Sequence, residues 1–227
     1  MESILRFGHL RVLHDADRTP VPAPGWFDPD WWRARKLARA ELGGRGEALA
    51  VDGPAGPAVL RGYRRGGLVQ HVVKADYLYL GLDATRAFRE WRLTDALARR
   101  GLPVPVPLAA AVWTFGLRYR AALLTRRLDG QPLSAVAADL DSEAWHRLGR
   151  TLRRFARAGV VHPDLNAGNV LIDPSERFHL LDFDRARTIN GNSDAVAMVD
   201  RLERSLLKLR LAHDRDALLE GTREAAG

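Results

Sequence analysis

Residues 161–172 read VHPDLNAGNVLI, and residues 180–184 read LLDFD. One residue separates His162 from Asp164, Asn169 lies five residues after Asp164, and Asp182 lies thirteen residues after Asn169. Taken singly, His-Pro-Asp fits a turn followed by a helix cap, and Asp-Phe-Asp fits a loop after a buried strand. The three pieces in this order, with apolar runs beside them, favour one functional unit over three unrelated turns.

The chain between Asn169 and Asp182 predicts a β-hairpin. Two short apolar runs, 170–172 and 178–181, are separated by the turn sequence Asp-Pro-Ser at 173–175. Short apolar runs on either side of such a turn are typical of paired strands. A hairpin here brings Asp182 back beside Asn169.

The spacing resembles the catalytic loop and metal-binding segment of the protein-kinase-like phosphotransferases. Phosphoryl transfer has a loose transition state, so its site needs a carboxylate that orients the acceptor hydroxyl and ligands that hold magnesium on the phosphates. The resemblance implies the first role for Asp164 and the second for Asn169 and Asp182. A set of oxygen ligands without thiolate suits Mg²⁺ better than zinc.

The rest of the chain predicts an α+β protein with a two-lobed, protein-kinase-like fold. Residues 43–127 are strand-rich with one helix at 85–99, and a short helix is expected at 33–42. Further helices are expected from a cap at Asp141 or Ser142 up to Gly159, and over about 194–211. We therefore expect a single domain over 1–227, with an N-terminal lobe at about 30–127 and a C-terminal lobe at about 128–227.

The strand-rich half also contains candidates for the other parts of a nucleotide site. Gly43, Gly44 and Gly46 leave backbone amides free to approach phosphate oxygens, although a glycine turn is often only a turn. A kinase also needs a cation on a strand, paired with a helical glutamate. Glu90 suits the glutamate, and Arg61 is the favoured cation because it ends the strand that pairs with the glycine loop. Lys74 is the alternative cation.

Composition excludes several classes of protein. The 227 residues include 35 Lys and Arg against 28 Asp and Glu, a formal net charge of +7, and no cysteine. There is therefore no disulfide framework, thiol nucleophile or thiolate metal site. The N-terminus lacks the pattern of a secretory signal, and no apolar run is long enough to span a membrane. Arginine supplies almost all of the positive charge, which a GC-rich genome also produces, so charge alone identifies no partner.

A closer resemblance extends from about residue 30 to 210. The chain is similar to bacterial 3-deoxy-D-manno-octulosonic acid (Kdo) kinases in four separate segments: 59–68, 85–93, 101–105 and 162–166. This resemblance implies ATP-dependent phosphorylation of the 4-hydroxyl of Kdo in a Kdo–lipid A precursor. It also implies a peripheral location on the cytoplasmic side of the inner membrane, with the anionic membrane surface as a partner and no nucleic acid.

The positive charge then has two candidate explanations. Arg64 and Arg65, beside Gly66 and Gly67, either meet an anionic acceptor or bilayer, or form a solvated turn. The basic residues at 201–210 are expected on the outer face of a packed helix rather than at a membrane. Two other functions stay open: a kinase for cationic small molecules such as aminoglycosides or choline-like alcohols, and a non-catalytic kinase-fold module that binds anionic lipid.

Overall fold

The computed structural model describes residues 1–42, 48–63 and 77–224, and these divide into two compact units. The first, here called the sheet unit, comprises Met1–Asp95 and Val106–Arg127. The second, the helical unit, comprises Ala96–Pro105 and Leu128–Gly227. The expected α+β composition is therefore confirmed. The division differs from the expected lobes in that the sheet unit begins at Met1 and the helical unit includes the segment 96–105.

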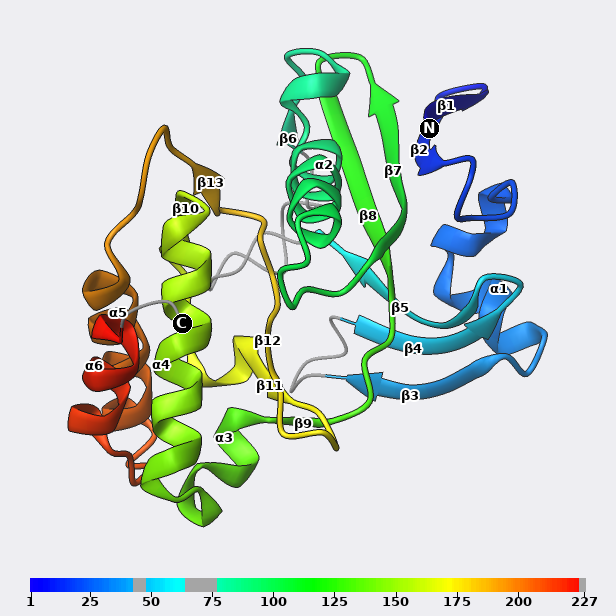
Figure 1. Cartoon of the computed structure of the whole chain (residues 1–227). Coiled ribbons are helices and arrows are strands. Elements are labelled where there is room, and N and C mark those ends of the chain that lie inside the picture. The colour runs from blue at the N-terminus through cyan, green and yellow to red at the C-terminus, as the bar shows by residue number, and fades with distance from the viewer. Residues whose placement is uncertain (43–47, 64–76, 225–227) are drawn as a thin grey trace. The chain divides into compact units, whose positions relative to one another are not determined.

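The sheet unit is built on one antiparallel sheet with the strand order β1-β2-β7-β8-β5-β4-β3, and β6 pairs with β8 beside this path (Figure 1). Its strands are β1 (Glu2–Phe7), β2 (Leu10–Asp15), β3 (Ala38–Leu42), β4 (Ala48–Gly53), β5 (Gly56–Gly62), β6 (Tyr77–Leu78), β7 (Pro107–Phe115) and β8 (Arg118–Arg126). The described helices of this unit are α1 (Pro29–Ala34) and most of α2 (Arg86–Arg99), with 3₁₀ helices at Pro24–Phe27 and Leu82–Ala84. The hairpin of β1 and β2 lies outside the elements expected from the sequence.

The central strands β7 and β8 bury side chains on both faces of the sheet. In β8, Ala122 and Leu124 join one core cluster while Ala121 and Leu123 join the other. Successive residues of a strand point to opposite faces, so an unbroken apolar run fills two cores at once. This explains why residues 107–112 and 121–124 are apolar throughout instead of alternating.

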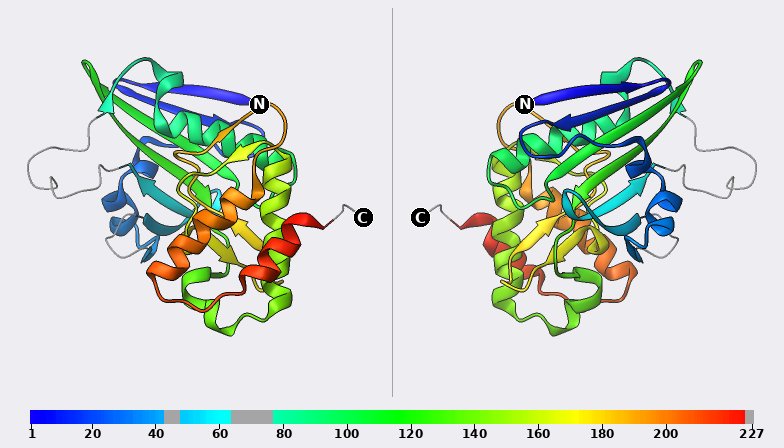
Figure 2. Two further views of the ribbon diagram at one scale, coloured as in Figure 1. Left: turned by 90° about the vertical axis from the view of Figure 1, so that its left-hand side faces the viewer. Right: turned by 90° about the vertical axis from the view of Figure 1, so that its right-hand side faces the viewer.

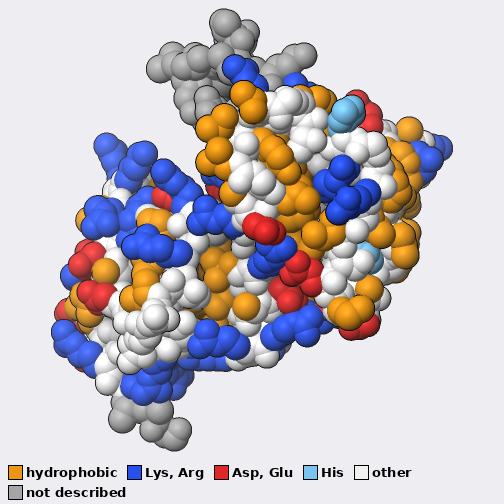
Figure 3. Space-filling view, turned by 90° about the horizontal axis from the view of Figure 1, so that it is seen from above, with side chains coloured by type: hydrophobic (Ala, Val, Ile, Leu, Met, Phe, Trp, Pro, Cys, Tyr) orange, Lys and Arg blue, Asp and Glu red, His pale blue; other side chains and the backbone are white. Residues whose placement is uncertain are grey.

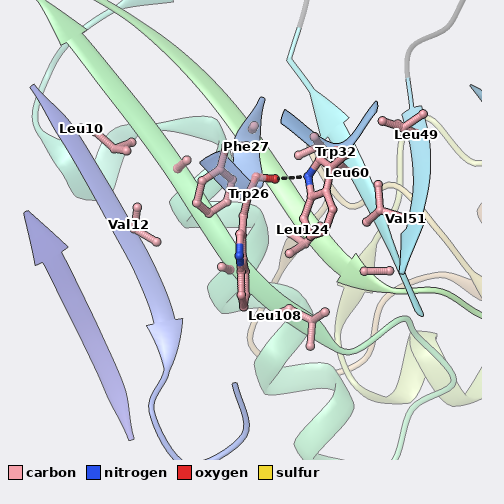
Figure 4. Packing of buried hydrophobic residues seen from close by; sticks show 14 residues of the cluster. Leu10, Val12, Trp26, Phe27, Trp32, Leu49, Val51, Leu60, Leu108 and Leu124 are labelled. Carbon is pink, nitrogen blue, oxygen red and sulfur yellow. Dashed lines mark hydrogen bonds between the residues drawn. The ribbon is translucent and has the colours of Figure 1, made fainter. Parts of the chain in front are cut away.

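Each face is covered by a different segment. Phe88 and Trp91 of α2 pack on one face. Trp26, Phe27 and Trp32, from the Pro-rich segment and α1, pack on the other (Figure 4). The indole Nε1 of Trp32 donates a hydrogen bond of 2.7 Å to the carbonyl oxygen of Trp26, which satisfies its polar atom inside the core.

The expected helix over 33–42 is wrong. The helix α1 begins earlier, because Asp28 caps it by accepting a hydrogen bond from the Asp30 amide at 2.9 Å and Pro29 occupies the first turn. It ends before Lys36, whose φ of 58° is left-handed. Residues Ala38–Leu42 then pair with β4 as the strand β3. Strand pairing outweighs the helix preference of Ala, Arg, Glu and Leu in this segment.

Among the described residues, the helical unit contains the end of α2, four further α-helices and two small sheets. The helices are the end of α2, α3 (Leu133–Val136), α4 (Ser142–Arg157), α5 (Ala195–Lys208) and α6 (Arg215–Arg223), and the strands are β9 (Gln131–Pro132), β10 (Val160–Val161), β11 (Val170–Ile172), β12 (Phe178–Leu180) and β13 (Arg187–Thr188). The order β12-β11-β9 forms one sheet and β10-β13 the other. The expected cap is Asp141, which accepts a hydrogen bond of 2.8 Å from the Ala144 amide. Figure 2 shows α5 and α6 lying beside α4.

Two glycines allow α4 and α6 to cross at backbone contact. A Cβ added at Gly149 would lie 2.2 Å from the Leu218 carbonyl oxygen, and one added at Gly221 would lie 2.2 Å from the His146 carbonyl oxygen. Both neighbours are backbone atoms, which cannot move aside as a flexible side chain can. The closeness of this crossing therefore depends on glycine on both helices.

Gly149→Ala is expected to lower the melting temperature, with a loss of about 1–3 kcal/mol in the free energy of unfolding because the new methyl group meets backbone. Without a clash, alanine would stabilise a helix by about 1 kcal/mol relative to glycine. A net destabilisation by Gly149→Ala would therefore show that the clash costs more than this gain. Thermal denaturation followed by circular dichroism measures the change. Gly62→Ala is the control, because its Cβ meets no atom within 4 Å. A higher melting temperature for Gly149→Ala would contradict the close crossing.

Candidate active site

His162 connects the loop at 161–169 to the segment at 180–184. It follows β10 and is buried, and its Nε2 donates a hydrogen bond of 3.1 Å to the carbonyl oxygen of Leu181. Its ring lies 5.1 Å from that of Phe183. Burial lowers the pKa of His162 below its ordinary value, against the Leu181 hydrogen bond, which raises it. The neutral imidazole therefore ties the 161–169 loop to the segment containing Asp182 and Phe183.

Asp164 points a partly exposed carboxylate toward Arg185. The Arg185 Nη1 lies 3.4 Å from Oδ1 and 3.3 Å from Oδ2 of Asp164. The backbone carbonyl of Asp164 accepts hydrogen bonds from the side-chain amides of Asn166, at 2.9 Å, and Asn169, at 3.3 Å. The two asparagines fix the backbone of the loop, while the Asp164 carboxylate stays accessible and carries only a long ion pair.

The hairpin that the sequence predicts is present, and it brings Asp182 back to Asn169. Val170 pairs with Leu180 in the β11–β12 ladder, and the Leu181 amide donates a hydrogen bond of 2.8 Å to the Asn169 carbonyl. Asp182 follows with a φ of 60°, a left-handed conformation that non-glycine residues seldom adopt. Such backbone strain persists where the surroundings enforce it and is concentrated at functional sites.

The donor set in this loop suits a hard divalent cation. The side-chain nitrogen of Asn169 donates a hydrogen bond to the Asp164 carbonyl, and its side-chain oxygen is a possible metal ligand. The carboxylate of Asp182 is a second possible ligand. Among the described residues there is no group of three or more His, Asp or Glu that could hold a metal on its own. Mg²⁺ needs no such cage, because it is usually bound by one or two protein oxygens together with substrate phosphates and water. The residues therefore fit Mg²⁺.

Two side chains of helix α5 make hydrogen bonds to the backbone of the 161–169 loop. Arg201 donates a hydrogen bond of 2.8 Å from Nε to the Pro163 carbonyl, and the Ser205 hydroxyl accepts one of 3.1 Å from the Ala167 amide. From the sequence Arg201 is expected only as a charge on the outer face of a helix. Its position four residues before Ser205 places both on one face, which is the signal that could have marked them as a pair.

The sheet unit contains a separate charged group on β5 and α2. Arg61 extends from β5, and its Nη2 lies 2.6 Å from Oε1 and 2.5 Å from Oε2 of Glu90. Glu90 is buried, and it also accepts a hydrogen bond from the hydroxyl of Tyr63. The guanidinium carbon of Arg61 lies 5.0 Å from the centre of the Tyr63 ring. A buried carboxylate requires such partners, because an unpaired charge in a protein interior is strongly destabilising.

This pairing agrees with the arrangement expected for Arg61 and Glu90, and it adds Tyr63, which the sequence analysis did not single out. Tyr63 lies two residues after Arg61, so on a strand it faces the same side, and that period was the available signal. Gly43, Gly44, Gly46 and Lys74 lie outside the described residues, as do Arg64 and Arg65. The choice between Arg61 and Lys74 as the phosphate-binding cation therefore stays a prediction.

In the helical unit, Asn169 is hydrogen-bonded to the Asp164 carbonyl and to the amide of Leu181, the residue before Asp182. In the sheet unit, Arg61 and Glu90 are paired. The family model described as "Lipopolysaccharide kinase (Kdo/WaaP) family" matches residues 29–221 of the chain. The chain belongs to the lipopolysaccharide kinase (Kdo/WaaP) family. This membership confirms the kinase-like fold class and makes the chain a phosphotransferase.

Relatives named as 3-deoxy-D-manno-octulosonic acid kinases align with most of this chain. A 3-deoxy-D-manno-octulosonic acid kinase of Xylella fastidiosa (strain M12) is 42% identical over 210 residues, which are 91% of this chain and 84% of the relative. The protein of the same name from Xanthomonas campestris pv. campestris (strain B100) is 44% identical over 89% of this chain and 82% of its own. That from Stenotrophomonas maltophilia (strain K279a) is 42% identical over 88% and 81%. The resemblance inferred from four segments is thus confirmed.

The turn of the hairpin between Asn169 and Asp182 is held by one carboxylate. Oδ1 of Asp173 accepts hydrogen bonds from the amides of Ser175, at 2.8 Å, and Arg177, at 3.1 Å. Its Oδ2 accepts from Nε2 of His179, at 2.8 Å, and from Nε of Arg177, at 3.0 Å. Burial alone would raise the pKa of Asp173, but these hydrogen bonds outweigh it and lower the pKa to about 2.

Asp173→Asn is expected to lower the free energy of unfolding by about 1–2 kcal/mol at pH 7, because neutral hydrogen bonds replace charge-assisted ones. The folded pKa, about 2, lies below the ordinary value of 3.8, so the contribution of the charge is complete above pH 3.8 and is lost as the pH falls toward 2. Urea unfolding at pH 7, 5, 4 and 3 measures this convergence of variant and wild type. The exposed Asp129→Asn is the control and should match the wild type throughout. A difference that does not depend on pH would contradict the role of the charge.

Proposed function

We propose that this protein transfers the γ-phosphoryl group of ATP to the 4-hydroxyl of Kdo in a Kdo–lipid A precursor, during assembly of the inner core of lipopolysaccharide. The proposal rests on one observation: Asn169 is hydrogen-bonded to the backbone of Asp164, and the hairpin that follows brings Asp182 close to Asn169. Family membership and relatives named as Kdo kinases support it.

In the proposed reaction Asp164 accepts a hydrogen bond from the acceptor hydroxyl and orients its oxygen toward the γ-phosphorus. A bond forms between that oxygen and the phosphorus while the bond from phosphorus to the β–γ bridging oxygen breaks, and ADP leaves. The hydroxyl proton passes to Asp164 as the new bond forms. The long ion pair to Arg185 leaves the Asp164 carboxylate able to make this contact.

Asn169 and Asp182 would hold Mg²⁺ on the donor phosphates through their side-chain oxygens. When bound, Mg²⁺ neutralises charge that develops on the phosphate oxygens. Arg61, fixed by Glu90, is the proposed side-chain cation for the phosphates of ATP. Gly43, Gly44 and Gly46 would offer backbone amides to them. ATP and Mg²⁺ are therefore the proposed cofactors.

Arg185 favours an anionic acceptor over a cationic one. Its guanidinium lies against the Asp164 carboxylate and is largely exposed. Kdo carries a carboxylate on the ring carbon next but one to C4, so a group bound at Asp164 through the 4-hydroxyl brings that carboxylate into the region of Arg185. A guanidinium binds carboxylates with directed hydrogen bonds, whereas it would repel the ammonium groups of an aminoglycoside or choline.

The proposed location is peripheral, on the cytoplasmic side of the inner membrane, with the anionic membrane surface as partner and no nucleic acid. In the described parts of the chain no helix has the length and apolar character needed to cross a bilayer. The acceptor lipid itself would bring the protein to the membrane.

Asp164→Asn is expected to reduce phosphate transfer from radiolabelled ATP to Kdo–lipid IVA by about 10³-fold or more, because the group that orients and deprotonates the acceptor is lost. The circular dichroism spectrum should stay that of the wild type, since the side chain is partly exposed. Asp129→Asn is the control and should keep full activity. Full activity of Asp164→Asn would overturn the mechanism. If the wild type phosphorylates only an aminoglycoside, the acceptor is wrong, and if it binds no ATP, the non-catalytic alternative is right.

Arg61→Ala is expected to raise the KM for ATP by about tenfold or more, since it removes the charge held by Glu90. Lys74→Ala is the matched comparison and is expected to leave this KM within about twofold of the wild type. Steady-state kinetics with ATP varied at saturating acceptor measure both. The reverse result would assign the phosphate contact to Lys74.

A further inference from the structure

One end of the sheet in the sheet unit carries an exposed apolar rim. We define the rim by Leu78, Leu80, Phe115 and Leu117, whose exposed fractions range from 49% to 76%. Exposed leucines scattered singly are ordinary, but a group of large apolar side chains at one place marks an interaction surface.

Strand pairing shows that the rim residues are neighbours. Phe115 and Arg118 pair across the β7–β8 turn, and Leu78 pairs with Arg118 where β6 joins β8. The Tyr79 amide donates a hydrogen bond of 2.9 Å to the Leu117 carbonyl, which places Leu80 one residue beyond this contact. The rim is therefore one patch at the β7–β8 turn, on a backbone held by the sheet.

The neighbouring β1–β2 turn extends the patch. The Thr114 amide donates a hydrogen bond of 3.1 Å to the His9 carbonyl, so both turns lie at the same end of the sheet. Phe7, which begins this turn, is 39% exposed. The patch thus presents aromatic and leucine side chains from two adjacent turns and from β6.

The charged residues nearest the rim along its strands are arginines. Residues 3–14, 77–82 and 113–120 contain no Asp or Glu, and they include Arg6, Arg11, Arg118 and Arg120. The acidic Asp83 follows this stretch and is paired with Arg92. Arg120 lies with its guanidinium carbon 5.3 Å from the centre of the Phe115 ring. Figure 3 shows hydrophobic side chains on the displayed face, with Lys and Arg as well as Asp and Glu side chains among them.

We infer that this rim is the surface by which the protein binds an anionic bilayer. Leucine and phenylalanine at turn tips can enter the region between headgroups and acyl chains, and arginines beside them can pair with lipid phosphates. A second copy of this chain fits less well, because the arginines of two facing rims would repel one another. The inference rests on the proposed function only in that the acceptor there is a lipid.

The test uses the full chain and vesicles of phosphatidylethanolamine and phosphatidylglycerol in a 3:1 ratio (about 25% anionic lipid), compared with pure phosphatidylcholine, in a flotation assay. The wild type is expected to bind the anionic vesicles and to be released by high salt. The double variant Leu80→Gln with Leu117→Gln should bind about tenfold or more weakly, because it places amides where the acyl region begins. Both side chains are exposed, so folding should be unaffected, which circular dichroism checks.

The matched control is Leu207→Gln with Leu209→Gln. These leucines are 60% and 51% exposed and lie beside Lys208 and Arg210 at the end of α5, outside the rim. This variant should bind vesicles as the wild type does. Loss of binding in the control with retention in the rim variant would overturn the assignment, as would failure of the wild type to bind anionic vesicles. Sedimentation equilibrium gives a third outcome: a dimer that the rim variant abolishes would assign the rim to a second copy.

Measurements of kinase activity on two acceptors distinguish a failure of this inference from a failure of the proposed function. On free Kdo, which needs no membrane, the rim variant should be as active as the wild type. On Kdo–lipid in vesicles its activity should fall in step with binding. If the wild type binds vesicles through the rim but phosphorylates neither acceptor, the proposed function is wrong and the assignment of the rim as a membrane-binding surface is still supported.

Discussion

The imidazole of His162 is the contact on which the candidate active site depends. Its hydrogen bond to Leu181 and its packing on Phe183 connect a loop that carries Asp164 to a segment that carries Asp182. Phe183 in turn stacks on Phe155 of α4, with ring centres 6.0 Å apart. Because the imidazole is buried, its neutral form is part of this structure, and acidification below its ordinary pKa would favour separation of the two segments. The chemistry of the loop therefore rests on a group that takes no part in the reaction itself.

Much of the fold could be predicted from local patterns. The helix at 142–157 has apolar side chains at spacings of three and four and an aspartate cap, and the 170–172 and 178–180 strands flank a turn with strong sequence signals. The failures occur where tertiary pairing decides. Residues 38–42 have helix-forming side chains and become a strand only because β4 lies beside them. The first strand pair was not expected at all, since charged residues interrupt its apolar positions.

The site could be predicted less completely than the fold. Asp164, Asn169 and Asp182 could be predicted as site residues because their chemistry and spacing are local in the sequence. Arg201 and Ser205 act on the same loop from a helix more than thirty residues away, with |i−j| values of 38 in both contacts. Arg185 contacts Asp164 across a separation of 21 residues. Contacts between residues so far apart leave no periodic pattern in the sequence. Only the folded structure therefore shows that these side chains lie at the candidate site.

The register of the hairpin between Asn169 and Asp182 limits how related chains can vary in length. Val170, Leu171 and Ile172 pair in order with Leu180, His179 and Phe178, and a residue added within either strand would reverse the faces of all that follow. Only the connecting residues 173–177 can lengthen without moving Asp182 relative to Asn169. Insertions and deletions in homologues should therefore collect there, and a search that demands a fixed spacing between the two residues would miss relatives whose turn has a different length.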